Sequence, residues 1–197
     1  PERWDGKKQF QFDALCALEE EAARLEVETG LPVHYRRVGR LTPLVSLRQR
    51  GQAEARVEAA NSVWSDRFAY NLPAAEAYAE WLDVEQAPLG VVFDDLSARI
   101  SPVHLLAALK AALYAHASFQ LVEGEAAGID AKAGSLKLAE ATQISFGNLV
   151  IAAGLGAFPL IEGLTGSPAG ALGNPVKGQA ALFEADELPA AANELPV

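Results

Sequence analysis

The chain has 197 residues, half of them hydrophobic, and carries a formal net charge of −10 at pH 7. This length suffices for one sizeable domain or two small ones with an apolar core. The negative charge argues against binding to nucleic acid or to an anionic membrane surface, because both require clustered Lys and Arg. The only basic cluster, residues 36–40, is expected to be a solvated strand edge rather than a phosphate site.

The sequence has no feature of a membrane protein or of a disulfide-bonded one. No apolar run reaches the roughly 18 residues of a membrane span, and no stretch resembles a signal peptide. Cys16 is the only cysteine, which leaves no disulfide framework and no cysteine metal site. We therefore expect a cytoplasmic protein without a metal ion.

The first part of the chain is predicted to be a helix followed by a strand. Apolar residues recur at spacings of three and four over residues 8–29, which indicates an amphipathic helix ended by Gly30 and Pro32. A weak alternation then predicts a strand over residues 33–38. The chain from 39 to 45 continues or bends this strand near a sheet edge, because it contains a proline.

Helical spacing returns at residues 48–61 and again at 74–82. Aromatic residues are concentrated between 64 and 81, which is compatible with a substrate pocket or, more simply, with a small core. Residues 90–93 read as a short strand. The two aspartates that close it, at 94 and 95, are expected to form a turn rather than an acid–base pair.

Another helix begins at Ser101-Pro102, with the serine as N-cap and the proline at the first helical position, and ends near His116. After this helix the spacing of apolar residues becomes typical of strands. Residues 119–123 are expected to enter a sheet, and three short segments between 126 and 146 are expected to form a small antiparallel meander.

The most apolar segment of the second half is Leu149–Ala153, which lies between Gly147-Asn148 and Gly154. An unbroken apolar run of this length predicts a strand covered on both faces, in the middle of a sheet. The small residues at its carboxyl end would let the backbone pass close to a ligand. A helix near 158–164, a Gly/Pro/Ser-rich link and a strand over 176–183 are expected to follow.

Four segments occur in a characteristic order: Ser101-Pro102 with Leu105-Leu106, Ala126–Ile129, Leu149–Gly154 and Pro175–Gln179. Together they resemble the flavin-dependent D-amino acid oxidase superfamily, which includes glycine oxidase and sarcosine oxidase. The resemblance runs from about residue 8 to about residue 182, and it is carried by the four segments jointly, since none is specific alone.

The resemblance implies a mixed α/β (α+β) fold: part of a Rossmann-like FAD domain with a small antiparallel meander, plus parts of an antiparallel substrate domain. On that pattern, residues 1–89 form the first helix and part of the substrate domain, and residues 90–170 form the middle of the FAD-binding domain. Residues 171–197 provide a return strand of the substrate domain.

The resemblance also implies that FAD is the cofactor. Ala126 stands where members usually have a valine whose backbone faces the adenine. Ala152, Ala153 and Gly154 match a segment that passes the cofactor, where small side chains permit close approach. No catalytic residue is nominated, because the protein in such chemistry mainly places the substrate carbon over the flavin.

The chain departs from the family pattern at both ends. It lacks the opening G-x-G-x-x-G fingerprint, whose glycines let a pyrophosphate sit on a helix N-terminus, and it lacks the family's closing flavin contact. It is about half the family's usual length, begins with Pro1 and contains no methionine. We therefore expect an internal fragment that is inactive on its own.

Three functional hypotheses remain open. The leading one is a fragment of an FAD-dependent oxidoreductase that oxidises a small amine or amino acid, of D-amino acid, glycine or sarcosine type, by hydride transfer to flavin. The second is an inert binding or interaction module with the same architecture. The third is an oxidoreductase for another substrate such as glycerol phosphate, against which the shortage of clustered Lys and Arg counts. The native sequence upstream discriminates the first two, since an enzyme requires the glycine fingerprint.

We predict that the 197-residue chain alone does not retain FAD, because the phosphate-binding turn is not in it. The measurement is the visible absorbance of the purified chain after incubation with FAD and gel filtration. A flavin spectrum at an equimolar amount would contradict the prediction.

Overall fold

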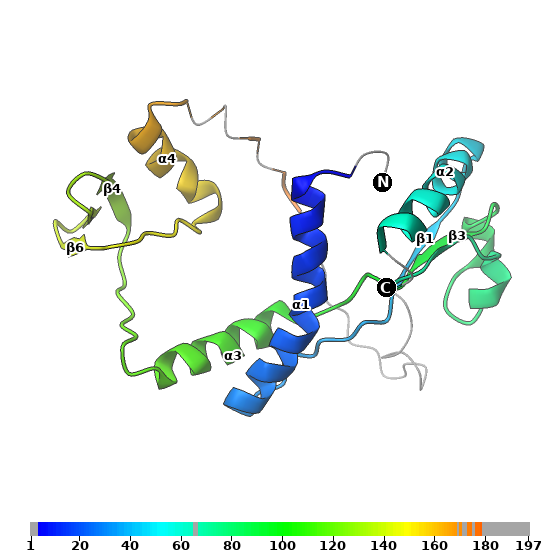
Figure 1. Ribbon diagram of the computed structural model, residues 1–197, viewed down its shortest axis with the longest axis horizontal. Coiled ribbons are helices and arrows are strands. Elements are labelled where there is room, and N and C mark those ends of the chain that lie inside the picture. The colour runs from blue at the N-terminus through cyan, green and yellow to red at the C-terminus, as the bar shows by residue number, and fades with distance from the viewer. Residues whose placement is uncertain (1–3, 65–66, 169, 171–172, 175, 179–197) are drawn as a thin grey trace. The chain divides into compact units, whose positions relative to one another are not determined.

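The computed structural model describes residues 4–64, 67–168, 170, 173–174 and 176–178. These residues form two compact units that divide between Phe119 and Gln120 (Figure 1). The first unit contains α1 (Gly6–Thr29), β1 (Arg40–Pro43), α2 (Leu47–Trp64), β2 (Tyr70–Asn71), the 3-10 turns η1 (Ala75–Tyr78) and η2 (Val84–Gln86), β3 (Val91–Asp94) and α3 (Pro102–Ala115). The second contains β4 (Ala126–Asp130), β5 (Ser135–Leu138), β6 (Gln143–Ser145), the 3-10 turn η3 (Gly154–Gly156) and α4 (Ala157–Thr165).

Helix α1 confirms the helix predicted for residues 8–29. The Asp5 side chain caps its start by accepting a hydrogen bond from the Lys8 backbone N–H at 2.9 Å. Gly30 ends it in the left-handed conformation, and its N–H donates to the Glu26 carbonyl at 2.8 Å. Within the helix Ala22 and Leu25 are buried, and Phe12, Leu15, Cys16 and Leu18 are half-buried.

The strand predicted for residues 33–38 is wrong. In this segment only Arg36 pairs, in an isolated antiparallel bridge with Arg99, and the regular strand β1 begins at Arg40. The backbone explains the difference, because His34 at φ +55° and Gly39 at φ +78° both leave the extended region. Two such residues interrupt a strand before it can build a ladder.

The first sheet is antiparallel, with β3 in the centre and β1 and β2 on its two sides. Successive residues of β3 point to opposite faces, so Val91 and Val92 belong to different cores. Val92 packs with Leu44 and Ala53 beneath α2. Val91 packs against η1 and η2. Pro43 lies in the edge strand β1, as the sequence indicates.

Helix α3 packs on α1 through Ala22, Leu25, Val33 and Ala108. Ser101 occupies the N-cap position with Pro102 in the first turn, as predicted, but the expected cap hydrogen bond is absent. The Ser101 hydroxyl instead lies 2.7 Å from Nδ1 of His104. The histidine in the first turn therefore competes with the backbone amides for this hydroxyl.

Arg37 does not belong to a solvated strand edge, in contrast to the sequence expectation for residues 36–40. Its side chain is 15% exposed, and its guanidinium donates to the carbonyls of Leu15 at 3.0 Å and Leu96 at 2.6 Å. It also pairs with Glu19 and lies 5.0 Å from the centre of the Phe68 ring. Arg37 thus ties α1 to the turn that follows β3.

The second unit confirms the antiparallel meander. Strands β4, β5 and β6 pair in sequence order, with a register shift near the start of β4. Helix α4 packs against β4 and confirms the helix predicted near 158–164. Figure 1 shows α4 beside the meander, and Gly166 closes the helix at φ +70°.

The buried strand predicted at Leu149–Ala153 is wrong. These residues pair with no described strand, and the Val150 side chain is 87% exposed. A strand covered on both faces needs neighbours, and the described residues supply none beside this segment. The strand expected at 119–123 is also irregular. Most of the strand expected at 176–183 lies outside the described residues.

The division at 119/120 differs from the domain boundaries expected from the family resemblance, at 89/90 and 170/171. The compact units are defined by contacts between residues, whereas a flavin or substrate domain is defined by what it binds, so the two divisions need not coincide. The assignment of residues 1–89, 90–170 and 171–197 to such domains stays a prediction. Among the described residues, no helix combines the length and apolar composition needed to cross a membrane.

We predict that Arg37→Ala lowers the free energy of unfolding by about 2–4 kcal/mol, because it leaves two carbonyls and a carboxylate without their charged donor. Arg24→Ala is the control, since Arg24 pairs with Glu21 and Glu28 on the exposed surface of α1. Urea unfolding of the three proteins is the measurement. Equal midpoints for both variants would contradict the role of Arg37.

Candidate functional site

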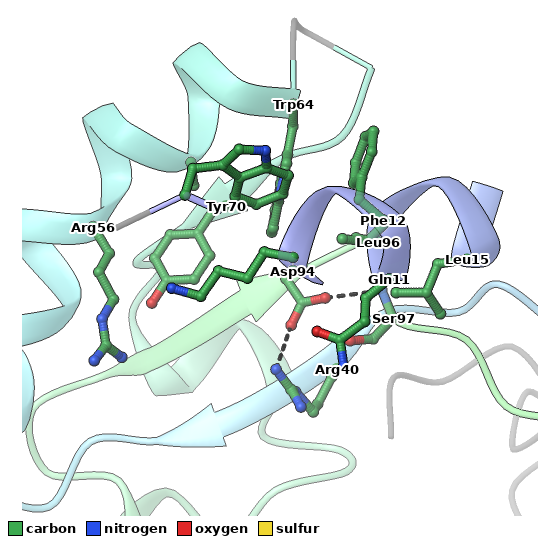
Figure 2. A pocket seen from close by; sticks show the side chains of 13 residues that line it. Gln11, Phe12, Leu15, Arg40, Arg56, Trp64, Tyr70, Asp94, Leu96 and Ser97 are labelled. Carbon is green, nitrogen blue, oxygen red and sulfur yellow. Dashed lines mark hydrogen bonds and ion pairs between the residues drawn. The ribbon is translucent and has the colours of Figure 1, made fainter. Parts of the chain in front are cut away.

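A cavity of about 580 Å³ lies in the first unit among α1, α2 and the carboxyl end of β3. It is lined by Trp4, Lys8, Gln11, Phe12, Leu15, Arg40, Arg56, Ala60, Trp64, Tyr70, Asp94, Leu96 and Ser97. Its volume is in the range of small-molecule sites. We call it the α1–α2 pocket (Figure 2).

Aromatic rings form much of the wall of the α1–α2 pocket. Trp64 and Tyr70 meet edge to face with ring centres 6.0 Å apart, and Phe12 meets Trp4 in the same way at 5.9 Å. The indole Nε1 of Trp64 is buried and has no hydrogen-bond partner among the described residues. A buried N–H without an acceptor is costly, and a ligand or water oxygen would satisfy it.

One polar group of the pocket is already neutralised. Asp94 is 3% exposed, and its Oδ2 lies 3.1 Å from Nη2 of Arg40. Its Oδ1 accepts from the backbone N–H of Ser97 at 2.9 Å. Figure 2 shows both contacts at the carboxylate. Asp94 thereby holds the turn that the sequence predicts, whereas Asp95 accepts from the Ala69 N–H at 2.6 Å and joins the end of β3 to the segment before β2.

Arg56 is a cation of the pocket without a partner among the described residues. It lies on α2 with an exposed side chain, and no hydrogen bond or ion pair joins it to a described residue. Its helix neighbour Arg50 differs, because Arg50 pairs with Glu54 at 2.7 Å. An arginine fork can bind a carboxylate through two parallel hydrogen bonds.

The pocket is therefore suited to an organic molecule with an apolar body and an acidic group. The aromatic walls provide apolar contact, and Arg56 provides a charge of the right sign. The sequence indicated the aromatic part, since Trp64 and Tyr70 come from the predicted aromatic cluster. It gave no sign of Arg56, which is one of several arginines in α2 and differs from Arg48 in lining the pocket.

The residues predicted to approach the flavin all lie in the second unit. Ala126 is the first residue of β4 and is half-buried. Ala152 and Ala153 are exposed and precede η3. Gly154 begins η3 at φ +55°, and no atom lies within 4 Å of the position that a Cβ would occupy there. The packing of α4 on β4 places these segments in one unit.

This arrangement fits a flavin in part. An open, exposed run of small residues lets a planar group approach the backbone, which is what the segment 152–154 provides. The sequence has no G-x-G-x-x-G turn for the pyrophosphate. The cofactor contacts of Ala126, Ala152, Ala153 and Gly154 stay predictions. In the described part of the chain, no group of three or more His, Cys, Asp or Glu is arranged for a metal ion.

A protein-family model described as "FAD dependent oxidoreductase" matches residues 4–197 of the chain. The chain belongs to this family. A search of solved structures found similarity to glycine oxidase from Geobacillus kaustophilus, with a TM-score of 0.66 and 19% sequence identity. A comparison with curated proteins found no match.

The match with glycine oxidase covers 82% of this chain and 43% of that enzyme's chain. The chain thus spans less than half the length of the structure it matches. The two findings confirm the resemblance drawn from the sequence and the mixed α/β fold with part of a Rossmann-like FAD domain. They also confirm FAD as the cofactor of the family to which the chain belongs.

We predict that Gly154→Val in the full-length protein lowers the FAD content more than it lowers stability. The valine would project into open space, so its cost to the fold is backbone strain of about 1–3 kcal/mol at a positive φ. A bound cofactor near this turn would be displaced by the same side chain.

Gly166→Val is the matched control, because Gly166 also has a positive φ of +70° and open space around its Cβ position. Flavin absorbance per protein and circular dichroism are measured for both variants. If both lose the same fraction of flavin, the effect of Gly154→Val is general strain, and the predicted contact is wrong.

Proposed function

We propose that the full-length protein is an FAD-dependent oxidoreductase that oxidises an amine or amino acid, of D-amino acid, glycine or sarcosine type. The observation that carries the proposal is the family match over residues 4–197, and the fold similarity to glycine oxidase supports it. FAD, when bound, accepts a hydride from the carbon beside the substrate nitrogen. The chain described here is expected to be inactive alone.

In this proposal the α1–α2 pocket holds the substrate. The guanidinium of Arg56 binds the substrate carboxylate, and the rings of Phe12, Trp64 and Tyr70 contact its apolar part. Asp94 stays paired with Arg40 and fixes the floor of the pocket. The protein positions the substrate and excludes water, and no dedicated acid or base is required of these residues.

The proposal includes a small-molecule partner and a cytoplasmic location. A single cysteine is compatible with a reducing compartment, since no disulfide framework can form within the chain. A neutral or cationic amine without a carboxylate would gain no binding energy from Arg56, because it has no group that accepts hydrogen bonds from the guanidinium. Amino acids are therefore expected to be better substrates than simple amines of the same size.

We predict that Arg56→Gln in the full-length protein raises KM for an amino acid by about tenfold to a hundredfold with a smaller change in kcat, because it removes a charge-assisted contact. Arg48→Gln is the matched control, since Arg48 is also exposed on α2 but does not line the pocket. The measurement is steady-state turnover with glycine, sarcosine, D-amino acids and an amine that lacks a carboxylate.

The amine serves as an internal control, because its KM should not respond to Arg56→Gln. If Arg56→Gln turns over amino acids with an unchanged KM, the substrate does not bind at Arg56. The proposed reaction would still stand, but the assignment of the α1–α2 pocket would be wrong. A flavoprotein that oxidises glycerol phosphate and no amine would establish the alternative substrate class. A full-length protein without flavin would establish the inert module.

A further inference from the structure

A second cavity in the first unit, of about 380 Å³, is lined by residues of β1 and of the amino-terminal half of α2. We call it the β1–α2 cavity. Arg40, Arg56 and Tyr70 line both this cavity and the α1–α2 pocket. The two cavities therefore meet at these three side chains.

Both cavities lie over the same face of the first sheet. In the ladder between β1 and β3, Arg40 pairs with Asp94 and Thr42 pairs with Val92. Paired residues have side chains on one face, and residues two apart in a strand share a face. The first pair lines the α1–α2 pocket and the second lines the β1–α2 cavity. The cavities thus follow each other along the strands at a step of roughly 7 Å, which is the length of two strand residues.

One face of α2 borders both cavities. Residues 49, 52, 53, 56, 60 and 64 follow the spacing of a single helix face. The first three line the β1–α2 cavity, the last two line the α1–α2 pocket, and Arg56 in the middle lines both. Ala53 and Ala60 are buried on this face, and their small side chains leave space between the helix and the sheet.

The β1–α2 cavity has an apolar floor and a polar rim. Leu44, Ala53 and Val92 pack together at its floor and are at most 8% exposed. On the rim, Oε1 of Gln49 accepts a hydrogen bond from the Val45 N–H at 3.0 Å, so its amide nitrogen remains the donor of this side chain. The described residues that line this cavity alone are uncharged. Such a lining suits an aliphatic chain with an apolar or neutral polar end.

We propose that the α1–α2 pocket and the β1–α2 cavity form one groove, and that the β1–α2 cavity holds the side chain of the substrate. This assignment rests on the proposed function, in which Arg56 binds the substrate carboxylate. Because Arg56 lines both cavities, an amino acid bound there has the β1–α2 cavity within reach of its side chain. The preferred substrates are then amino acids with an uncharged side chain of several carbon atoms. Glycine and sarcosine carry no side chain and would leave this cavity unfilled.

The test is steady-state turnover of the full-length, flavin-loaded protein with glycine, D-alanine, D-norvaline and D-norleucine. This series extends one unbranched side chain. Each methylene that becomes buried favours binding, so kcat/KM is expected to rise by about tenfold or more from D-alanine to D-norleucine. Equal values along the series would show that the β1–α2 cavity is not used, while the proposed oxidation of amino acids would stand. A flavin that none of the four compounds reduces would contradict the proposed function as well.

Thr42→Trp tests whether this dependence on side-chain length arises in the β1–α2 cavity. The register with Val92 directs the side chain of residue 42 to the sheet face that lines the cavity, so the indole would fill it. The ratio of kcat/KM for D-norleucine to that for D-alanine should fall by about tenfold. This ratio is measured within one variant, so it does not depend on the fraction of folded protein. If Thr42→Trp loses its flavin, Gln52→Trp fills the cavity from α2 and replaces it in the test.

Ala55→Trp is the matched control, because Ala55 is exposed on α2 and lines neither cavity. Its ratio should equal that of the unmodified protein. If neither Thr42→Trp nor Gln52→Trp lowers the ratio, the side chain binds elsewhere and the assignment of the β1–α2 cavity is wrong. A fall of the same size in Ala55→Trp would also overturn it, since the effect would then not be specific to the cavity.

Discussion

The first unit depends on the buried guanidinium of Arg37. The amino-terminal half of α1 has no buried residue of its own, because its buried positions, Ala22 and Leu25, lie farther along against α3. Nη2 of Arg37 donates to the Leu15 carbonyl in that half of the helix. Nη1 of Arg37 donates to the Leu96 carbonyl in the turn after β3. Gln11, Phe12 and Leu15 line the α1–α2 pocket from the same half of α1. Arg37 thus fixes this wall of the pocket together with the edge-to-face contact between Phe12 and Phe68, whose ring centres are 6.0 Å apart.

The sequence predicts best those elements that are specified locally. The helix over 8–29 and the meander after Ala126 follow from periodicity, caps and glycines, and both are present. The strand expected at 149–153 failed because an apolar run does not reveal whether neighbouring strands exist to cover it. Arg37 could not be recognised either, since the carbonyls that it binds are 22 and 59 residues away in the sequence. Long-range partners of this kind leave no local pattern.

The candidate sites likewise divide into those that a local sequence pattern indicates and those that only the fold brings together. The four small residues expected beside the flavin were found through a family resemblance, and the family itself is now established by the match over residues 4–197. The α1–α2 pocket follows from the fold instead, because it joins segments that are distant in sequence. Arg40 and Arg36 lie only four positions apart, yet one neutralises Asp94 and the other faces Arg99 across a bridge. Composition alone grouped them as one solvated cluster.

We propose that the full-length protein oxidises amines or amino acids through its flavin. The most direct measurement is anaerobic mixing of the full-length flavoprotein with glycine, sarcosine and D-amino acids, while the visible absorbance of the flavin is followed. The account predicts that at least one of these compounds bleaches the oxidised flavin spectrum, with the corresponding imine hydrolysis product formed in equal amount. A flavin that is reduced by dithionite but by none of these compounds would contradict the account.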